Sequence, residues 1–242
     1  MSRSLAIIQS NYIPWRGYFD IIDRVDTFMI LDDVQFSKNT WRNRNRLKTP
    51  KGPAWLTIPV ATGGKFGQTI AEVEVADRSW AAKHWQLWSQ NYAATPYFKS
   101  YSGKLKDLYG RAAELRRLSE INVLFLRTLC EWLGISTTFI SSADFAVTGV
   151  KTDRVVALCQ ASGADRYLSG PAAQDYIEVE KFISAGIELE YIDYSGYREY
   201  DQPFPPFEPA VSAIDLILCT GPEAIRYIRE REAVREPSAL PC

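Results

Sequence analysis

Cysteine, histidine and long apolar runs are scarce in this 242-residue sequence, which has four cysteines and one histidine. No two cysteines form a C-x-x-C pair, and Cys130, Cys159 and Cys219 lie in apolar helical contexts. We therefore expect buried free thiols, and neither these nor Cys242 indicates a disulfide framework or a metal site. No apolar stretch reaches the roughly 18 residues of a transmembrane helix. A strand-like run directly follows Met1, so we expect no signal peptide and a cytoplasmic protein.

An excess of either charge is also missing, because 28 basic residues face 29 acidic ones and the formal net charge is −1. Such a balance is atypical of proteins that bind nucleic acid, and we expect a small-molecule ligand instead. Aromatic residues are abundant, with 7 Trp, 13 Tyr and 11 Phe. Many lie beside polar and turn residues, which favours an aromatic-lined groove in addition to a core.

Short apolar runs alternate with amphipathic segments over much of the chain. The first unit passes from a buried strand through a proline-bearing loop and a helix to a second strand, which stops at Asp32 and Asp33. Further runs of this kind predict a set of parallel strands at residues 5–9, 27–32, 137–141, 166–169 and 187–192. We therefore predict a three-layer α/β fold with a mostly parallel, Rossmann-like sheet.

Two segments interrupt this rhythm. Residues 34–76 predict a β-rich insertion after the second strand, including a hairpin, with strands at 44–49, 54–60 and 69–75. Residues 78–134 predict a helical segment in the middle of the chain, with helices at 78–92, 98–110 and 119–133. Gly134 follows the last of these as a helix cap. We expect one domain over residues 1–234 and a frayed tail at 235–242.

The loop after the first strand is a candidate binding site, because ligands of parallel sheets bind beyond the carboxyl ends of the strands. Gln9 and Asn11 carry amides that can donate and accept hydrogen bonds. Gly17 permits a close approach at the start of a helix, where free N–H groups favour anions. The candidate ligand contacts in this loop are Gln9, Asn11, Tyr12, Trp15, Gly17 and Tyr18. Alternatively, its proline, tryptophan and glycine only shape a tight turn.

The second loop begins with adjacent carboxylates, Asp32 and Asp33. Such a pair is costly unless it is solvated, paired or bound to a cation, and neighbours on a strand point in opposite directions. We expect at least one of them to act as a general base, to bind an ammonium or hydroxyl group, or to hold a metal, although no ligand cluster accompanies the pair. The alternative is an ion pair with Arg42, Arg44 or Arg46.

Arginine and asparagine alternate further along the same loop, in the run WRNRNR. Arginine grips phosphate or carboxylate through two parallel hydrogen bonds, which favours a clamp for such a group. The candidate ligand contacts here are Gln35, Trp41, Asn43, Arg44 and Asn45. A solvated hairpin edge is the alternative.

Two further positions carry chemical groups of interest. His84 is the only histidine and lies in a helix rich in tryptophan, so it is either a catalytic base or a structural residue. Ser169 and Gly170 follow the fourth predicted strand and could cradle an anion, with Tyr176 close behind. A plain strand-to-helix turn is the competing interpretation.

Several of these segments resemble the WbqC-like protein family, namely IIQSNYIPWRGYF, DTFMILDDVQFSKNTWRNRNRLKT, WLTIPV, KHWQLWSQNYAATPYF, GADRYLSGPAAQDYI and SAIDLILCTG. The likeness runs in order from about residue 5 to 232, and Ser10 departs from the proline of the family's usual Q-P-N-Y. The resemblance implies a role in the biosynthesis of O-antigen or other surface polysaccharides, and the transfer of an acyl or aminoacyl group to an amino sugar. It assigns no catalytic residue.

The opening unit is also similar to the first βα unit of nucleotidylyltransferase-like proteins. Those proteins carry a glycine–histidine pair where this chain has Gly17 and Tyr18. The missing histidine argues against standard nucleotidyl transfer and leaves nucleotide binding open.

Three hypotheses follow. The first is a transferase acting on an amino sugar or related amine, with Asp33, Asp32 or His84 taking the proton and an activated donor as the second partner. The second is a nucleotidylyltransferase-like or adenylate-forming enzyme. The third is a non-catalytic protein that binds a sugar or nucleotide sugar, which predicts an aromatic groove without convergent titratable groups. The sequence identifies no cofactor or metal site.

Overall fold

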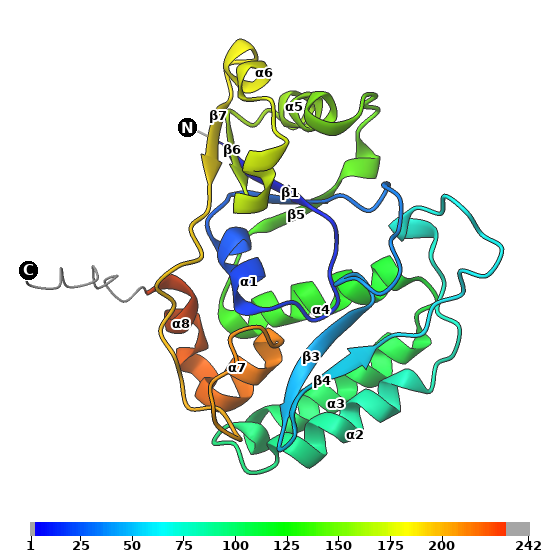
Figure 1. Cartoon of the computed structure of the whole chain (residues 1–242), viewed down its shortest axis with the longest axis vertical. Coiled ribbons are helices and arrows are strands. Elements are labelled where there is room, and N and C mark those ends of the chain that lie inside the picture. The colour runs from blue at the N-terminus through cyan, green and yellow to red at the C-terminus, as the bar shows by residue number, and fades with distance from the viewer. Residues whose placement is uncertain (1–2, 231–242) are drawn as a thin grey trace, which may run out of the picture.

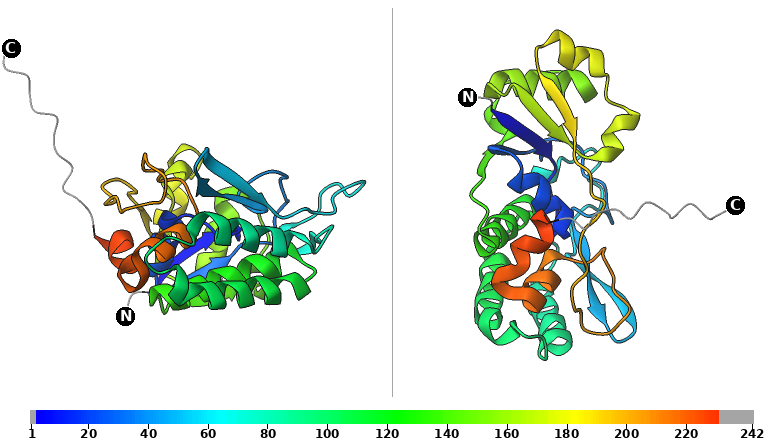
Figure 2. Two further views of the ribbon diagram at one scale, coloured as in Figure 1. Left: turned by 90° about the horizontal axis from the view of Figure 1, so that it is seen from below. Right: turned by 90° about the vertical axis from the view of Figure 1, so that its left-hand side faces the viewer.

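The computed structural model describes residues 3–230. Figure 1 shows the elements along the chain, and Figure 2 shows two further views. The strands are β1 (Ser4–Ile8), β2 (Thr27–Ile30), β3 (Arg44–Thr49), β4 (Gly52–Thr57), β5 (Thr138–Ser141), β6 (Arg166–Ser169) and β7 (Glu188–Tyr191). The α-helices are α1 (Arg16–Asp23), α2 (Trp80–Tyr92), α3 (Phe98–Glu114), α4 (Leu118–Leu133), α5 (Lys151–Ser162), α6 (Val179–Ser184), α7 (Ala213–Thr220) and α8 (Arg226–Arg229).

The main sheet has five strands in the order β5-β2-β1-β6-β7, and every neighbouring pair is parallel. The predicted Rossmann-like parallel sheet is therefore confirmed. Strand order reverses between β1 and β6, because the chain builds outward from β1 to β5 on one side and then adds β6 and β7 on the other. In open α/β sheets, ligands bind outside the carboxyl ends of the strands at this reversal.

Helices cover both faces of the sheet and complete the predicted three layers (Figure 1). Side chains alternate along β1, so that Leu5 and Ile7 pack in one apolar cluster and Ala6 in the other. The first cluster includes Leu158 of α5 and Phe182 of α6. The second includes residues of α1, α4 and α7, and it continues into α2 and α3. Burial on both faces explains why the strands are continuously apolar rather than alternating.

The insertion after β2 contains the predicted hairpin. Strands β3 and β4 pair antiparallel from Arg44 opposite Thr57 to Thr49 opposite Gly52, whose φ of +99° suits glycine at the turn. The hairpin lies beside α2 and α3 at the end of the molecule away from α5 and α6 (Figure 1). The helical segment follows as predicted, and Gly134 ends α4 in the left-handed conformation.

The strand predicted at residues 69–75 is wrong. The segment forms a short 3₁₀ turn at Ile70–Glu72 and only isolated bridges on either side. The reason is local, because the Glu72 carboxylate accepts hydrogen bonds from the backbone N–H and the hydroxyl of Thr69 at 2.8 and 2.9 Å. These bonds close a capping box and offer the backbone an alternative to a strand ladder. The tail predicted at 235–242 lies outside the described residues.

The expected free thiols are confirmed where the structure describes them. Cys130, Cys159 and Cys219 are buried and form no disulfide, and burial raises the pKa of Cys130 and Cys159 to about 12. These thiols are therefore protonated core residues at neutral pH. Cys242 lies outside the described residues.

Candidate functional site

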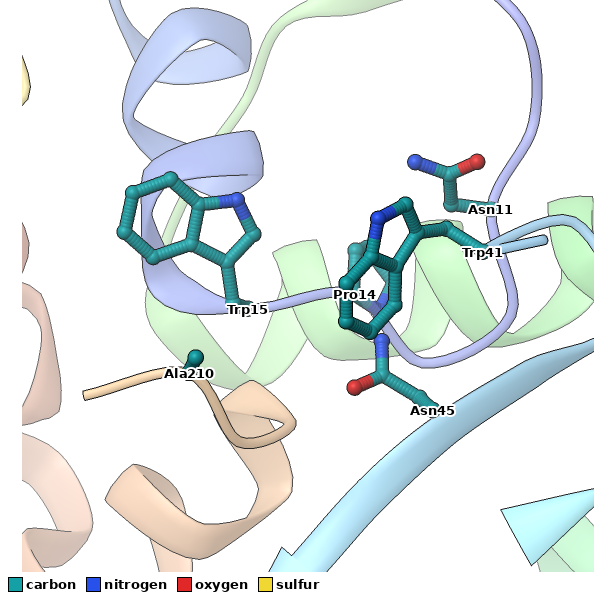
Figure 3. Close-up of a pocket in the computed structure, with 6 residues that line it drawn as sticks. All are labelled: Asn11, Pro14, Trp15, Trp41, Asn45 and Ala210. Carbon is teal, nitrogen blue, oxygen red and sulfur yellow. The ribbon is translucent and has the colours of Figure 1, made fainter. Parts of the chain in front are cut away.

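A pocket lies where distant parts of the chain meet (Figure 3). Its volume is about 220 Å³, and the residues that line it are Asn11, Pro14, Trp15, Trp41, Asn45 and Ala210. They come from the loop between β1 and α1, from β3 and the segment before it, and from the segment before α7. We call it the aromatic pocket. It is smaller than the roughly 300–1,000 Å³ typical of sites for drug-sized ligands, and it suits a single ring.

Trp15 forms one wall of the aromatic pocket and is held from behind by other rings. Its indole ring lies 5.1 Å from Tyr194 and 6.0 Å from Tyr197. A Cβ atom at Gly17 would lie only 2.3 Å from the same indole, so a glycine is required there to seat Trp15. The sequence predicted that Gly17 lets a ligand approach the helix start. In the structure, Trp15 occupies that space.

Trp41 forms the opposite wall and remains 42% exposed. In Figure 3, Trp15 and Trp41 flank the space between them. The ring of Trp41 lies 5.5 Å from that of Trp55 on β4, which is 45% exposed, and the guanidinium of Arg44 lies 4.1 Å from the centre of the Trp55 ring. An exposed aromatic surface therefore extends from the pocket along the hairpin.

Two amides supply the polar groups of the aromatic pocket. The Asn45 amide is held at both ends, since it donates to the carbonyl of Tyr12 at 3.1 Å and accepts from the backbone N–H of Arg46 at 2.8 Å. The Oδ1 atom of Asn11 is buried and has no hydrogen-bond partner among the described residues. The same is true of Asn43 and Asn122, and Asn11 differs from them in lining the pocket, where its amide group can form a hydrogen bond with a bound hydroxyl or amine.

Asp32 is buried in a closed network rather than exposed at the pocket. Its carboxylate accepts hydrogen bonds from the backbone N–H of Ser10 at 2.8 Å, from the Ser10 hydroxyl at 2.7 Å and from the hydroxyl of Ser119 on α4. Arg42 donates to the Gln9 side chain at 2.6 Å. Burial lowers the pKa of Arg42, and the nearby Asp32 carboxylate opposes that shift. Asp32 thus fixes the loop after β1.

Asp33 points the other way, as expected for neighbours at a strand end. Its carboxylate forms an ion pair with Arg154 of α5 and accepts a hydrogen bond from the Ser142 hydroxyl at 2.6 Å. The alternative partners that the sequence suggested were Arg42, Arg44 and Arg46; for Asp33 the partner is Arg154 instead, whereas Arg42 lies near Asp32. The side chain is 28% exposed, so Asp33 ties the end of β2 to α5 at the surface.

His84 is a buried residue that joins α2 to the loop after β1 and to β4. It is hydrogen-bonded at 2.9 Å to the hydroxyl of Tyr12, which is fully buried, and to the backbone of Thr57. Burial lowers the pKa of His84 to about 4, so the ring is neutral at pH 7. No hydrogen bond or ion pair of the described residues joins His84 to Asp32 or Asp33. The three predicted catalytic residues therefore form no directly hydrogen-bonded group.

The chain matches the WbqC-like protein family over residues 9–227. This chain belongs to the WbqC-like protein family. It is 43% identical over 227 residues to an uncharacterized protein of Mycobacterium tuberculosis, Rv1507c, with 94% of this chain and 98% of the relative covered. No solved structure matches the chain.

Other predicted contacts of this WbqC-like protein are internal to the fold. Tyr12 is fully buried, Tyr18 is buried and donates to the carbonyl of Gln9 at 2.8 Å, and buried Asn43 donates to the carbonyl of Ile58 at 3.1 Å. As arranged here, these side chains support the loops instead of facing a ligand. Gln35 is exposed and pairs through its backbone with Thr69, outside the lining of the aromatic pocket.

A second cavity of about 260 Å³ lies at the carboxyl ends of β1 and β2, against α5. Gln9, Arg154 and Tyr176 are among its lining residues, and Tyr176 is 67% exposed. Gln9 and Asn11 thus belong to different cavities on either side of one loop. Ser169 is buried, and a Cβ atom at Gly170 would meet no atom within 4 Å, so Gly170 is not required for a close approach.

Asp215 of α7, the most buried carboxylate among residues 3–230, was not among the residues that the sequence pattern singled out. It is fully buried and accepts hydrogen bonds from the hydroxyls of Tyr92 and Tyr200 and, at 2.9 Å, from the Gln202 amide. Burial raises the pKa of Asp215, while these bonds and nearby Lys48 oppose the rise. An aspartate inside the apolar run AIDLILC was the available signal.

Two features are missing from residues 3–230. No group of three or more His, Cys, Asp or Glu side chains among these residues could hold a metal ion. No helix in the same part of the chain is both long and apolar enough to cross a membrane.

Proposed function

We propose that this WbqC-like protein binds a sugar ring in the aromatic pocket, as the acceptor in a group transfer of surface-glycan or specialised-metabolite biosynthesis. The observation that carries the proposal is the combination of two indole walls, Trp15 and Trp41, with the side-chain amide of Asn11 in the same lining. A sugar presents an apolar C–H face that packs on an indole, and hydroxyl or amine groups that donate to an amide oxygen. The family resemblance supports the same class of ligand.

The transferred group is an acyl or aminoacyl group, and the acceptor atom is a sugar amine. None of the residues that line the pocket is titratable. Arg46 of β3 lies over Trp41, which lines the pocket, and Arg44 lies over the neighbouring Trp55. Nearby positive charge disfavours an ammonium ion and lowers the pKa of the amine, which leaves more of the nucleophilic free base. The amine would then attack the activated acyl carbon, expel the donor's leaving group and release its proton to that group or to water.

The predicted bases take other roles in this proposal. Asp32 and His84 are buried and hydrogen-bonded, so they position the loop after β1 from behind. Asp33, which is partly exposed, faces α5 rather than the lining of the aromatic pocket. A pocket without its own base suits an acceptor that is nucleophilic once deprotonated.

Binding of glucosamine and N-acetylglucosamine, measured by saturation-transfer NMR and calorimetry, tests the first step. We expect binding to the native protein and about a tenfold loss in Trp41→Ala, because an exposed indole wall is removed. Trp132→Ala is the matched control, since Trp132 packs on Tyr101 of α3 and is absent from the pocket lining. No binding by the native protein, or equal losses in both variants, would refute the proposal.

Transfer is tested separately with acyl thioesters and aminoacyl donors, with the product followed by mass spectrometry. Glucosamine is expected to gain the acyl mass, and glucose, which lacks the amine, is the matched control. Equal transfer to both sugars would contradict an amine acceptor.

Nucleotide binding is a second candidate function, and the cavity beside α5 favours it. That cavity lies near the strand reversal where nucleotides bind in related sheet topologies. Arg154 and Lys151 supply positive charge, and Tyr176 supplies an exposed ring. Thermal stabilisation by ATP with Mg²⁺ that is lost in Tyr176→Ala supports this candidate; a native protein that ATP does not stabilise speaks against it.

A further inference from the structure

Three cations share one face of β3, and the chain neutralises them unequally. Arg44, Arg46 and Lys48 alternate along the strand, so their side chains project from the same face. Figure 2 shows the segment before α7 running beside this hairpin. The side chain of Lys48 donates to the carbonyl of Pro206, and Arg46 donates to the carbonyl of Ala210 at 3.1 Å.

Arg46 also has a carboxylate partner, since Glu208 lies 3.8 Å from its guanidinium. Arg44 has neither kind of partner. Within residues 3–230, the structure shows no ion pair or hydrogen bond of its side chain, and its Nε atom is buried without an acceptor. The guanidinium carbon of Arg44 lies 4.1 Å from the centre of the Trp55 ring. Positive charge on this face is therefore uncompensated at Arg44.

The position of Arg44 connects it to the aromatic pocket. Trp55, over which the guanidinium lies, is in ring contact with Trp41 at 5.5 Å, and Trp41 lines the pocket. Both indoles are partly exposed. A ligand group attached to a sugar in the pocket would meet this surface as it leaves the pocket past Trp41.

We propose that Arg44 binds an oxyanion, a phosphate or a carboxylate, carried by the sugar whose ring occupies the aromatic pocket. This inference rests on the proposed function and names its substrate class as acidic or phosphorylated sugars. A guanidinium presents parallel N–H donors that match the oxygens of either group, and stacking on Trp55 holds its plane in place before the ligand arrives. The Asn11 amide would form a hydrogen bond with the sugar ring while Arg44 donates to the anion at the edge of the ring.

Calorimetry with three probes tests the inference: N-acetylglucosamine, its 1-phosphate and glucuronic acid. We expect at least one charged sugar to bind the native protein tenfold or more tightly than the neutral one, with the advantage falling as NaCl rises from 50 to 300 mM. In Arg44→Met, which keeps the aliphatic stem, the affinity advantage of the charged sugar over the neutral one should vanish. The tighter of the two charged probes identifies the oxyanion.

Arg127→Met is the matched control, because Arg127 also lies over an aromatic ring, that of Phe139, at 5.1 Å, and lines neither cavity described above. Arg127→Met should keep the full affinity advantage of the charged sugar over the neutral one. Melting temperatures check that both variants are folded. Equal affinity for neutral and charged sugars in the native protein overturns the inference and leaves the proposed function standing. An advantage that survives in Arg44→Met also overturns it. Absence of binding by all three probes refutes the proposed function and this inference together.

Discussion

The aromatic pocket and the buried ionisable networks of this protein treat polar atoms in opposite ways. In the networks, Asp32, Asp215 and His84 are enclosed, and each is hydrogen-bonded to neighbours from other elements. In the pocket, the Oδ1 atom of Asn11 is buried without a partner among the described residues, and Trp41 is left partly exposed. The titratable groups that the sequence suggested as catalytic support the fold, whereas the pocket is bordered by the exposed indole of Trp41 and by neutral amides.

This difference has an energetic meaning. A buried polar group whose partners are all present adds to stability, whereas one left without a partner costs about 1–3 kcal/mol. Asn11 shares this cost with Asn43 and Asn122, and it differs from both in lining a pocket. The contrast therefore separates residues whose loss should unfold the protein from residues whose loss should weaken a ligand, and each prediction below probes that separation.

Asp215→Ala is expected to have the largest effect on stability. It would leave the hydroxyls of Tyr92 and Tyr200 without their acceptor and Lys48 with less nearby negative charge, at a cost of about 3–5 kcal/mol in the free energy of unfolding. Urea denaturation followed by tryptophan fluorescence measures this. Asp201→Ala is the control. Asp201 is exposed and lies between Tyr200 and Gln202 in the sequence, so its loss should change the free energy of unfolding little. If Asp215→Ala lowers the free energy of unfolding by less than about 1 kcal/mol, the enclosed networks do not stabilise the fold as proposed.

His84 predicts a dependence of stability on pH. Its folded-state pKa of about 4 lies below the ordinary value of 6.5, so the unfolded chain binds a proton that the folded chain excludes. The contribution is complete above pH 6.5 and is lost as pH falls toward 4, by about 3 kcal/mol in total. In His84→Gln this part of the slope should be missing, while the slope from carboxylates persists. Parallel stability curves for both proteins between these pH values would show that His84 is not the cause.

Much of the fold could be predicted because the strands are buried on both faces. The first strand, predicted at 5–9, is Ser4–Ile8, and the fourth, predicted at 166–169, is Arg166–Ser169. Continuous apolar runs bounded by polar loops carry this signal locally. The prediction at 69–75 was wrong because Thr69 and Glu72 form a local cap that overrides the alternating pattern.

The candidate site could be predicted only in part. The loop rule for parallel sheets led to Asn11, Trp15, Trp41 and Asn45, which the structure brings into one pocket. The burial of Asp32 could not be foreseen, because its partner Ser119 lies 87 residues away on α4. Ionisable side chains look alike in a sequence whether they end in solvent or in a closed network, and long-range packing decides between the two.

Asp32 and Asp33 are adjacent in the sequence, so substituting each in turn compares an enclosed carboxylate with a partly exposed one. Asp32→Ala removes the acceptor of two Ser10 hydrogen bonds and leaves buried donors unpaired, so we expect a loss of about 2–3 kcal/mol in the free energy of unfolding. Asp33→Ala breaks a partly exposed ion pair with Arg154, which should cost about 1 kcal/mol or less. Thermal and urea unfolding of the two variants, compared with the native protein, measure the difference. If Asp33→Ala is the more destabilising, the assignment of Asp32 to the closed network is wrong. Ser10, which Asp32 holds, directly precedes Asn11 of the pocket lining. The proposal that Asp32 positions this loop behind the pocket would then be wrong as well.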